Sequence, residues 1–191
     1  MLNSPSAAND ERPEVEDGAW IHPSAALVGN VSIGSRAYVG PQASIRADEP
    51  GPDGSVAPVV IESEANVQDG AVLHALGGTS VVVRSRTSVA HGAVVHGPCQ
   101  VGPGCFIGFN TVVYDAELGE QVVVMHGAVV ENVEIPDGLI VPSRAAVCCQ
   151  EDVRALDEAS ESALAFADEV SRTNVHLAEV KNSEQQTGYY E

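Results

Sequence analysis

The sequence has 191 residues, with 9 Lys and Arg residues against 27 Asp and Glu residues, so its formal net charge is −18. This acidic balance argues against a nucleic-acid-binding protein and against a surface that docks on anionic lipid, since both need clustered positive charge. Hydrophobic residues make up 44% of the chain but aromatic residues only 4%, which predicts one domain with an aliphatic core and no membrane-spanning run of about 18 apolar residues.

Residues 1–18 are polar and acidic, and they contain no apolar stretch of the kind found in secretory signals. We expect them to form a mobile acidic tail, and we expect the protein to be cytoplasmic. Four cysteines without Cys-x-x-Cys spacing predict free thiols rather than a disulfide framework or a cysteine zinc site.

From residue 19 to residue 149, aliphatic residues return every six positions, with two interruptions. This period matches neither the 3.6 residues of a helix nor the alternation of an ordinary strand. The nineteen aliphatic positions are Ile21, Leu27, Ile33, Val39, Ile45, Ile61, Val67, Leu73, Val83, Val89, Val95, Val101, Ile107, Val113, Leu118, Val124, Val130, Ile135 and Val141.

A period of six is typical of a parallel β-helix, in which each hexad forms a short strand and a corner. The aliphatic residue points into the core, and small or β-branched residues fill the corners. Three hexads close one triangular coil, so the repeat predicts about six stacked coils. The predicted fold class is an all-β solenoid over 19–149, with the insertions at 50–60 and 77–82 forming loops outside the coils.

Beyond residue 149 the six-residue period ends. Residues 150–181 are predicted to form a C-terminal α-helical segment that packs on the β-helix, with a longer helix from about residue 160. The inward positions of this helix are expected to be Leu164, Ala167, Val170, Asn174 and Leu177. Residues 182–191 are expected to be a second mobile tail.

The repeat also predicts which side chains leave the coils on the same face. Arg46, His74 and His96 each follow an aliphatic position directly, in corresponding hexads of successive coils. They form one column with rungs about 4.8 Å apart, so His74 and His96 can share one metal ion. Asp69 and His91 come two residues after their aliphatic positions and form a second column on the preceding face.

The two columns of one chain lie on different faces, so they can meet only between neighbouring copies. If three parallel copies surround a threefold axis, the His74 and His96 column of one copy meets the partner's His91. In the same register, Arg46 meets the partner's Asp69. Three imidazoles with a fourth position open are the ligand set of a catalytic zinc site.

Three segments around these residues resemble the metal-site segments of the γ-class carbonic anhydrases. They are SIRADE (44–49), NVQDGAVLHAL (66–76) and SVAHGAVVHGP (88–98). The resemblance covers about residues 20–180 and extends to IPDGLIVPS (135–143) and NVHLAE (174–179). It implies a left-handed parallel β-helix, a homotrimer, and reversible hydration of carbon dioxide to bicarbonate and a proton by metal-bound hydroxide at the trimer interfaces.

The resemblance implies that His74, His91 and His96 are the metal ligands, with His91 donated by the adjacent subunit. It also implies an ion pair between Arg46 and Asp69 across that interface. Zinc (Zn²⁺) is the expected metal, and Fe²⁺ or Co²⁺ would fit the same ligands.

Four further residues match polar positions of the family's active site. Gln68 matches a residue that hydrogen-bonds the metal-bound solvent. Glu49 matches a carboxylate that assists proton movement and positions the substrate. Asn66 and Asn174 match residues that line the pocket.

Two positions depart from the family's pattern. Gly77 stands where the archaeal prototype begins an acidic loop with a proton-shuttling glutamate, and Arg172 stands where it has a tyrosine. Proton export by that route is therefore expected to be impaired. Gly77→Glu is expected to raise the rate at low buffer concentration if the turn tolerates the side chain.

Two other functions stay open. A hexapeptide acyltransferase would need one catalytic histidine and a groove for acyl-CoA, whereas the sequence supplies three converging histidines and no evident basic pocket. A non-catalytic γ-class scaffold or assembly subunit agrees with the missing acidic loop. The intact set of three histidines favours the enzyme.

Overall fold

The nineteen aliphatic positions of the repeat lie inside the coils, where each is at most 5% exposed. Together they belong to one hydrophobic cluster, which confirms the predicted core and the all-β solenoid. The computed structural model describes residues 2–5 and 10–186. One face holds seven parallel strands, so the solenoid has about seven turns rather than the predicted six.

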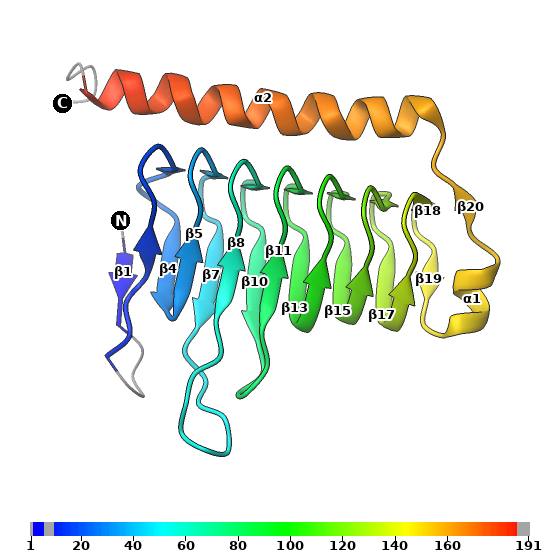
Figure 1. The fold of residues 1–191 in the computed structure, drawn as a ribbon, viewed down its shortest axis with the longest axis horizontal. Helices are drawn as coiled ribbons and strands as arrows, with labels where there is room; N and C mark the ends of the chain where they lie inside the picture. The colour runs from blue at the N-terminus through cyan, green and yellow to red at the C-terminus, as the bar shows by residue number, and fades with distance from the viewer. Residues whose placement is uncertain (1, 6–9, 187–191) are drawn as a thin grey trace.

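The coils have three faces (Figure 1). The helix face consists of β3 (Trp20–Ile21), β6 (Tyr38–Val39), β9 (Asn66–Val67), β12 (Ser88–Val89), β14 (Phe106–Ile107), β16 (Val123–Val124) and β18 (Leu139–Val141). The histidine face, named for His74 and His96, holds β4 (Ala26–Gly29), β7 (Ser44–Ala47), β10 (Val72–Ala75) and β19 (Ala146–Val147). The outer face holds β5 (Val31–Ile33), β8 (Val59–Ile61) and β11 (Val81–Val83). Three long strands continue from the histidine face onto the outer face, and they are β13 (Val94–Val101), β15 (Val112–Leu118) and β17 (Val129–Ile135).

The N-terminal segment differs from the mobile tail that was expected for 1–18. Strand β1 (Leu2–Ser4) pairs with β4, and β2 (Glu14–Val15) pairs with β5, both in parallel. The first complete coil otherwise presents an open strand edge with unpaired backbone groups, which a preceding segment can satisfy whatever its side chains. Residues 1 and 6–9 of the predicted tail lie outside the described residues.

The C-terminal segment closes one end of the solenoid and then returns along it (Figure 1). The short helix α1 (Gln150–Arg154) places the buried Val153 over the last coil, and β20 (Asp157–Glu158) pairs antiparallel with β18. The long helix α2 (Glu161–Gln186) then runs over the helix face to the N-terminal end. It is one turn longer than predicted, and of the predicted second tail only 187–191 lie outside the described residues.

The face that α2 buries consists of small residues. Ala167, Ser171, Asn174 and Ala178 are each at most 8% exposed, whereas Leu177, which was expected to face inward, is 36% exposed. Small side chains let the helix axis approach the sheet closely, and this turns the larger apolar residues toward the edge of the contact. Neither described helix has the combination of length and apolar character that a membrane span needs.

Candidate metal centre

The histidine column forms as the repeat predicts. Strand β10 places His74 directly between Arg46 of β7 and His96 of β13 in the parallel ladder. The two imidazoles meet with 3.2 Å between Nδ1 of His74 and Nε2 of His96. The column continues along the same face to Tyr114, whose ring centroid lies 5.6 Å from that of His96.

The two facing nitrogens have the spacing of a metal-ligand pair. Tetrahedral Zn²⁺ with bonds of about 2.0–2.1 Å separates two ligand nitrogens by about 3.3 Å, close to the 3.2 Å observed here. Nδ1 of His96 lies 3.1 Å from the carbonyl oxygen of Gly97. Because a carbonyl oxygen can only accept, Nδ1 of His96 carries the proton and Nε2 keeps its lone pair. This is the tautomer that a metal ligand needs.

His74 is enclosed between the histidine column and two carboxylates. Its Nε2 is buried and has no hydrogen-bond partner among the described residues, although Glu49 Oε1 lies 3.4 Å away and Asp48 Oδ1 3.7 Å away. Burial, with the Arg46 guanidinium as the next largest cause, lowers the pKa of His74 despite these carboxylates. With carboxylates beside Nε2, the proton of the neutral ring belongs on that atom, which leaves Nδ1 free to bind a cation together with Nε2 of His96. The donor set of this half of the site therefore fits Zn²⁺.

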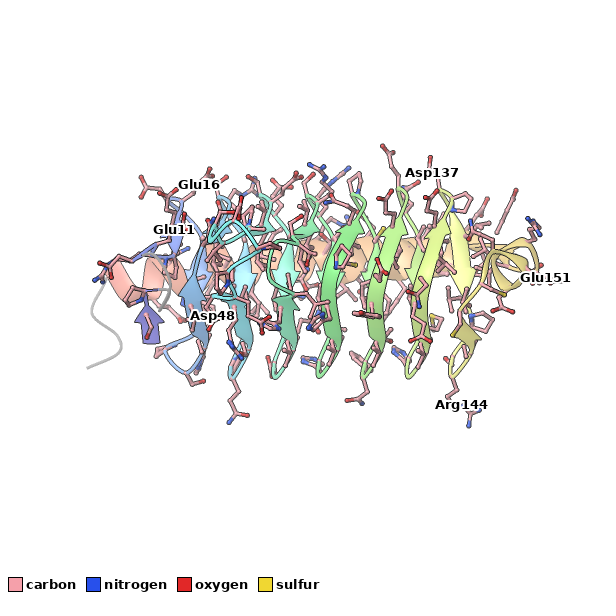
Figure 2. All side chains as sticks on the ribbon, turned by 90° about the horizontal axis from the view of Figure 1, so that it is seen from below. Glu11, Glu16, Asp48, Asp137, Arg144 and Glu151 are labelled. Carbon is pink, nitrogen blue, oxygen red and sulfur yellow. The ribbon has the colours of Figure 1, made fainter. Side chains whose placement is uncertain are left out.

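Asp48 is a functional candidate that the sequence interpretation missed. Its two oxygens each lie 3.1 Å from Nη2 of Arg46, so within one chain this carboxylate is the ion-pair partner of Arg46. The loop 48–58 joins β7 to β8 and extends from the coils on the side opposite α2 (Figure 1). Figure 2 labels Asp48 near the base of this loop. Because residues two apart on an extended strand share a face, the spacing of Arg46 and Asp48 was the signal that could have found it.

The remaining candidates gather on a different part of the molecule, in what we call the helix-side pocket. This cavity of about 510 Å³ lies between α2 and the helix face. Gln68, Asp69, His91 and Asn174 all line it. The predicted site residues therefore form two separate groups in one chain, one on the histidine face and one in this pocket.

A buried chain of side-chain amides supports the helix-side pocket. Asn66 donates to the hydroxyl of Ser88 over 2.8 Å, and Gln68 donates from Nε2 to Oδ1 of Asn66 over 3.0 Å. Gln68 thereby keeps its carbonyl oxygen as a free acceptor. The amide of Asn174 donates to the carbonyl of Val170 one turn earlier in α2, which fixes its orientation.

His91 lies at the exposed rim of this pocket. It is 53% exposed and lies 3.8 Å from Asp69 in the column below it. On its other side it stacks on Phe109 at 5.3 Å between centroids, and Phe109 stacks on His126 at 4.4 Å. Within the described part of a single chain, no three His, Cys, Asp or Glu side chains converge on one point that could hold a metal ion.

Comparison with known proteins gives the wider context. The family model "Bacterial transferase hexapeptide (six repeats)" matches residues 12–47. The chain is 34% identical over 188 residues to the carbonic anhydrase of Methanosarcina thermophila, a match that covers 87% of this chain and 74% of that protein. It is also 34% identical to the carboxysome assembly protein CcmM of a Nostoc species over 86% of this chain, but it spans only 30% of CcmM.

Among solved structures, a putative acetyltransferase of Bacillus cereus superposes with a TM-score of 0.81 over 95% of this chain and 97% of that one. Its sequence is 19% identical, so this likeness shows the fold alone. The hexad core, the family model and the long match to the archaeal enzyme lead to one conclusion. The chain belongs to the hexapeptide-repeat, left-handed β-helix proteins and is a distant homologue of the Methanosarcina thermophila carbonic anhydrase.

Proposed function

We propose that the chain is the subunit of a trimeric, metal-dependent carbonic anhydrase whose sites are each shared between two copies. The observation that carries the proposal is the pair of adjacent imidazole nitrogens of His74 and His96. It occurs in a chain whose similarity to a carbonic anhydrase extends over most of both sequences. In this proposal the partner's His91 is the third ligand.

A partly exposed apolar stripe beside the histidine column supports assembly. Val72, Val94, Val112 and Val129 lie opposite one another in successive strands, and Val72 and Val112 are each 36% exposed. Contiguous exposed apolar residues are typical of a surface that another protein covers. A second copy offers complementary apolar residues next to His91, namely Phe109, Phe166 and Leu177.

Zn²⁺ would be held by His74, His96 and the partner's His91. When bound, it supplies Lewis-acid chemistry that brings the pKa of a coordinated water near 7. Glu49 lies beside Nε2 of His74, where it orients this ligand, and being 45% exposed it can exchange protons with solvent. The partner's Gln68 orients the reacting molecules through its free carbonyl oxygen.

The lining of the helix-side pocket favours a substrate without phosphate groups. Six of the twelve described residues that line it are aromatic or aliphatic, and none of the twelve is Lys or Arg. A CoA-dependent acyltransferase would need cations for the phosphates of its cofactor. The pocket therefore supports carbon dioxide hydration over acyl transfer.

The direct test is a carbon dioxide hydration assay on Zn²⁺-loaded protein, with sedimentation of the same sample. A metallated trimer that accelerates hydration agrees with the proposal. A metallated trimer without hydration activity would instead favour a non-catalytic assembly subunit, in line with the similarity to CcmM. A monomer that binds no metal would contradict both.

The hydration rate is expected to depend strongly on external buffer. Among the described carboxylates, Glu49 lies closest to Nε2 of His74, and the loop that follows it meets Gly77 rather than a second acceptor. Glu62 and Glu64 are engaged by Arg84 and Arg36. The measurement is the maximal rate against imidazole concentration at fixed pH. A rate that stays constant down to low millimolar buffer would show that an internal proton route exists.

A further inference from the structure

Two loops meet through glycines next to the candidate metal site. They are loop 48–58, between β7 and β8, and turn 76–80, between β10 and β11. The loop that follows β7 passes Gly51, and the turn that follows β10 passes Gly77 and Gly78 (Figure 1). A Cβ atom on Gly77 would lie 2.3 Å from the carbonyl oxygen of Pro50. A Cβ atom on Gly51 would lie 2.8 Å from Cα of Gly78. We call this backbone-to-backbone contact the glycine contact.

The glycine contact corrects the expectation for Gly77→Glu. The atoms that any side chain at position 77 would meet first are backbone atoms of Pro50, which cannot rotate away. The turn therefore does not tolerate a glutamate without separating the two loops. The reason for glycine here is the closeness of the neighbouring coil, since Gly77, unlike Gly78 at φ +81°, does not have a left-handed backbone.

On one side, the glycine contact is formed by Pro50 and Gly51, which directly follow Glu49 in the chain. Strand β7 ends at Ala47, so Glu49 is already outside the regular ladder and its placement depends on the segment that follows it. Among the described residues, the only charged group or ring that Glu49 contacts is the His74 imidazole, at 3.4 Å. The half-exposed side chain therefore has little of its own to hold it, and the backbone at Pro50 and Gly51 must do so.

A third glycine, Gly97, directly follows His96 and lies against the turn 76–80 in the same way. A Cβ atom on Gly97 would lie 2.6 Å from the carbonyl oxygen of Ser80. That carbonyl also accepts the amide hydrogen of Cys99 over 2.9 Å. The segments that follow Glu49, His74 and His96 are thus stacked on one another at positions where only glycine fits.

We infer that Gly77 is a positioning residue, which holds the Glu49 carboxylate beside His74 by letting the two loops touch. This inference rests on the proposed function, because it assigns Glu49 a place next to a proposed metal ligand. The short glycine turn thus fixes the carboxylate that lies beside Nε2 of His74, while Nδ1 of the same ring faces His96. Gly77→Ala is expected to separate the loops and move Glu49 away from His74.

The test is a double-substitution cycle read out as Zn²⁺ affinity, measured on the full-length protein by competition with a chelator. A carboxylate beside a ligand contributes to the affinity for a dication, so Glu49→Gln is expected to weaken Zn²⁺ binding about tenfold. Gly77→Ala is expected to weaken it by a similar factor. The double variant is expected to stay near tenfold, because both changes remove the same interaction.

Ser55→Ala is the matched control. Ser55 lies exposed in the same loop, has no left-handed backbone, and donates from its hydroxyl to Asp53 over 2.7 Å. This variant is expected to bind Zn²⁺ like the unmodified protein. Hydrogen exchange adds a second readout, in which Gly77→Ala but not Ser55→Ala should accelerate exchange of the Gly51 and Thr79 amides, which are bonded inside the two loops.

Each outcome separates the inference from the proposed function. Unchanged Zn²⁺ affinity in Gly77→Ala, or a hundredfold loss in the double variant, would overturn the positioning role. An unchanged affinity in Glu49→Gln would overturn it as well. If the unmodified protein binds Zn²⁺ but does not hydrate carbon dioxide, the proposed function fails while the cycle still decides the inference.

Discussion

His96→Ala is expected to remove the bound metal and to lower the carbon dioxide hydration rate by about a thousandfold or more. The Nε2 atom of His96 lies 3.2 Å from Nδ1 of His74, and the carbonyl of Gly97 holds it in the ligating tautomer. Alanine leaves two imidazoles for each proposed site, which is too few to retain Zn²⁺ against dilution. The measurements are metal content per subunit and hydration rate of the purified variant.

His126→Ala is the control for this substitution. His126 belongs to the same column as His91, and its Nδ1 accepts the amide hydrogen of Phe109 over 3.0 Å. Its loss costs one exposed hydrogen bond, the stacking contact with Phe109 and an edge contact with Phe106, without touching the proposed ligands. Full metal content and near-normal rate are expected for His126→Ala. Full metal content in His96→Ala would remove His96 from the site.

Arg46→Ala is expected to weaken the trimer by about a hundredfold in its dissociation constant. In the proposed assembly Arg46 meets the partner's Asp69 at each of three interfaces. An exposed ion pair contributes about 1 kcal/mol at most, so three interfaces contribute about 3 kcal/mol, which is about a hundredfold. The coils themselves should remain folded, because Arg46 is 44% exposed and its contact within the chain is Asp48.

Sedimentation at a series of protein concentrations measures this change. Arg84→Ala is the matched control, since Arg84 is 49% exposed and pairs with Glu62 of its own chain on a different edge of the coils. Dissociation in Arg46→Ala but not in Arg84→Ala is expected. Equal behaviour of the two variants would contradict the pairing of Arg46 with a neighbouring copy.

The coils and the histidine column could be predicted from the sequence because the repeat fixes them. Each hexad buries its aliphatic residue, and a shift by one residue would expose the whole set. The spacing from Arg46 to His74 and from His74 to His96 therefore determines the ladder, although insertions separate these residues along the chain.

The features that could not be predicted lie where the period breaks. Neither insertion has a repeat of its own, so nothing in the sequence shows that Gly77 meets Pro50 or that Gly51 meets Gly78. Asp48 follows the last regular residue of its strand, so its spacing of two residues from Arg46 was the one signal for it in the sequence. The rotation of α2 depends on how closely small residues such as Ala167 and Ala178 approach the sheet, which helical spacing alone does not determine.

The central claim is that two copies of the chain build each metal site. His91→Ala and His96→Ala each destroy every proposed site in a pure trimer, so the two variants are unfolded together in equal amounts and reassembled. A site is intact only when its His96 comes from a His91→Ala chain and its His91 from a His96→Ala chain. Random mixing gives a chance of one half times one half, so about a quarter of the sites should recover Zn²⁺ and activity. A mixture as inactive and metal-free as its parents, after verified subunit exchange, would contradict the shared site.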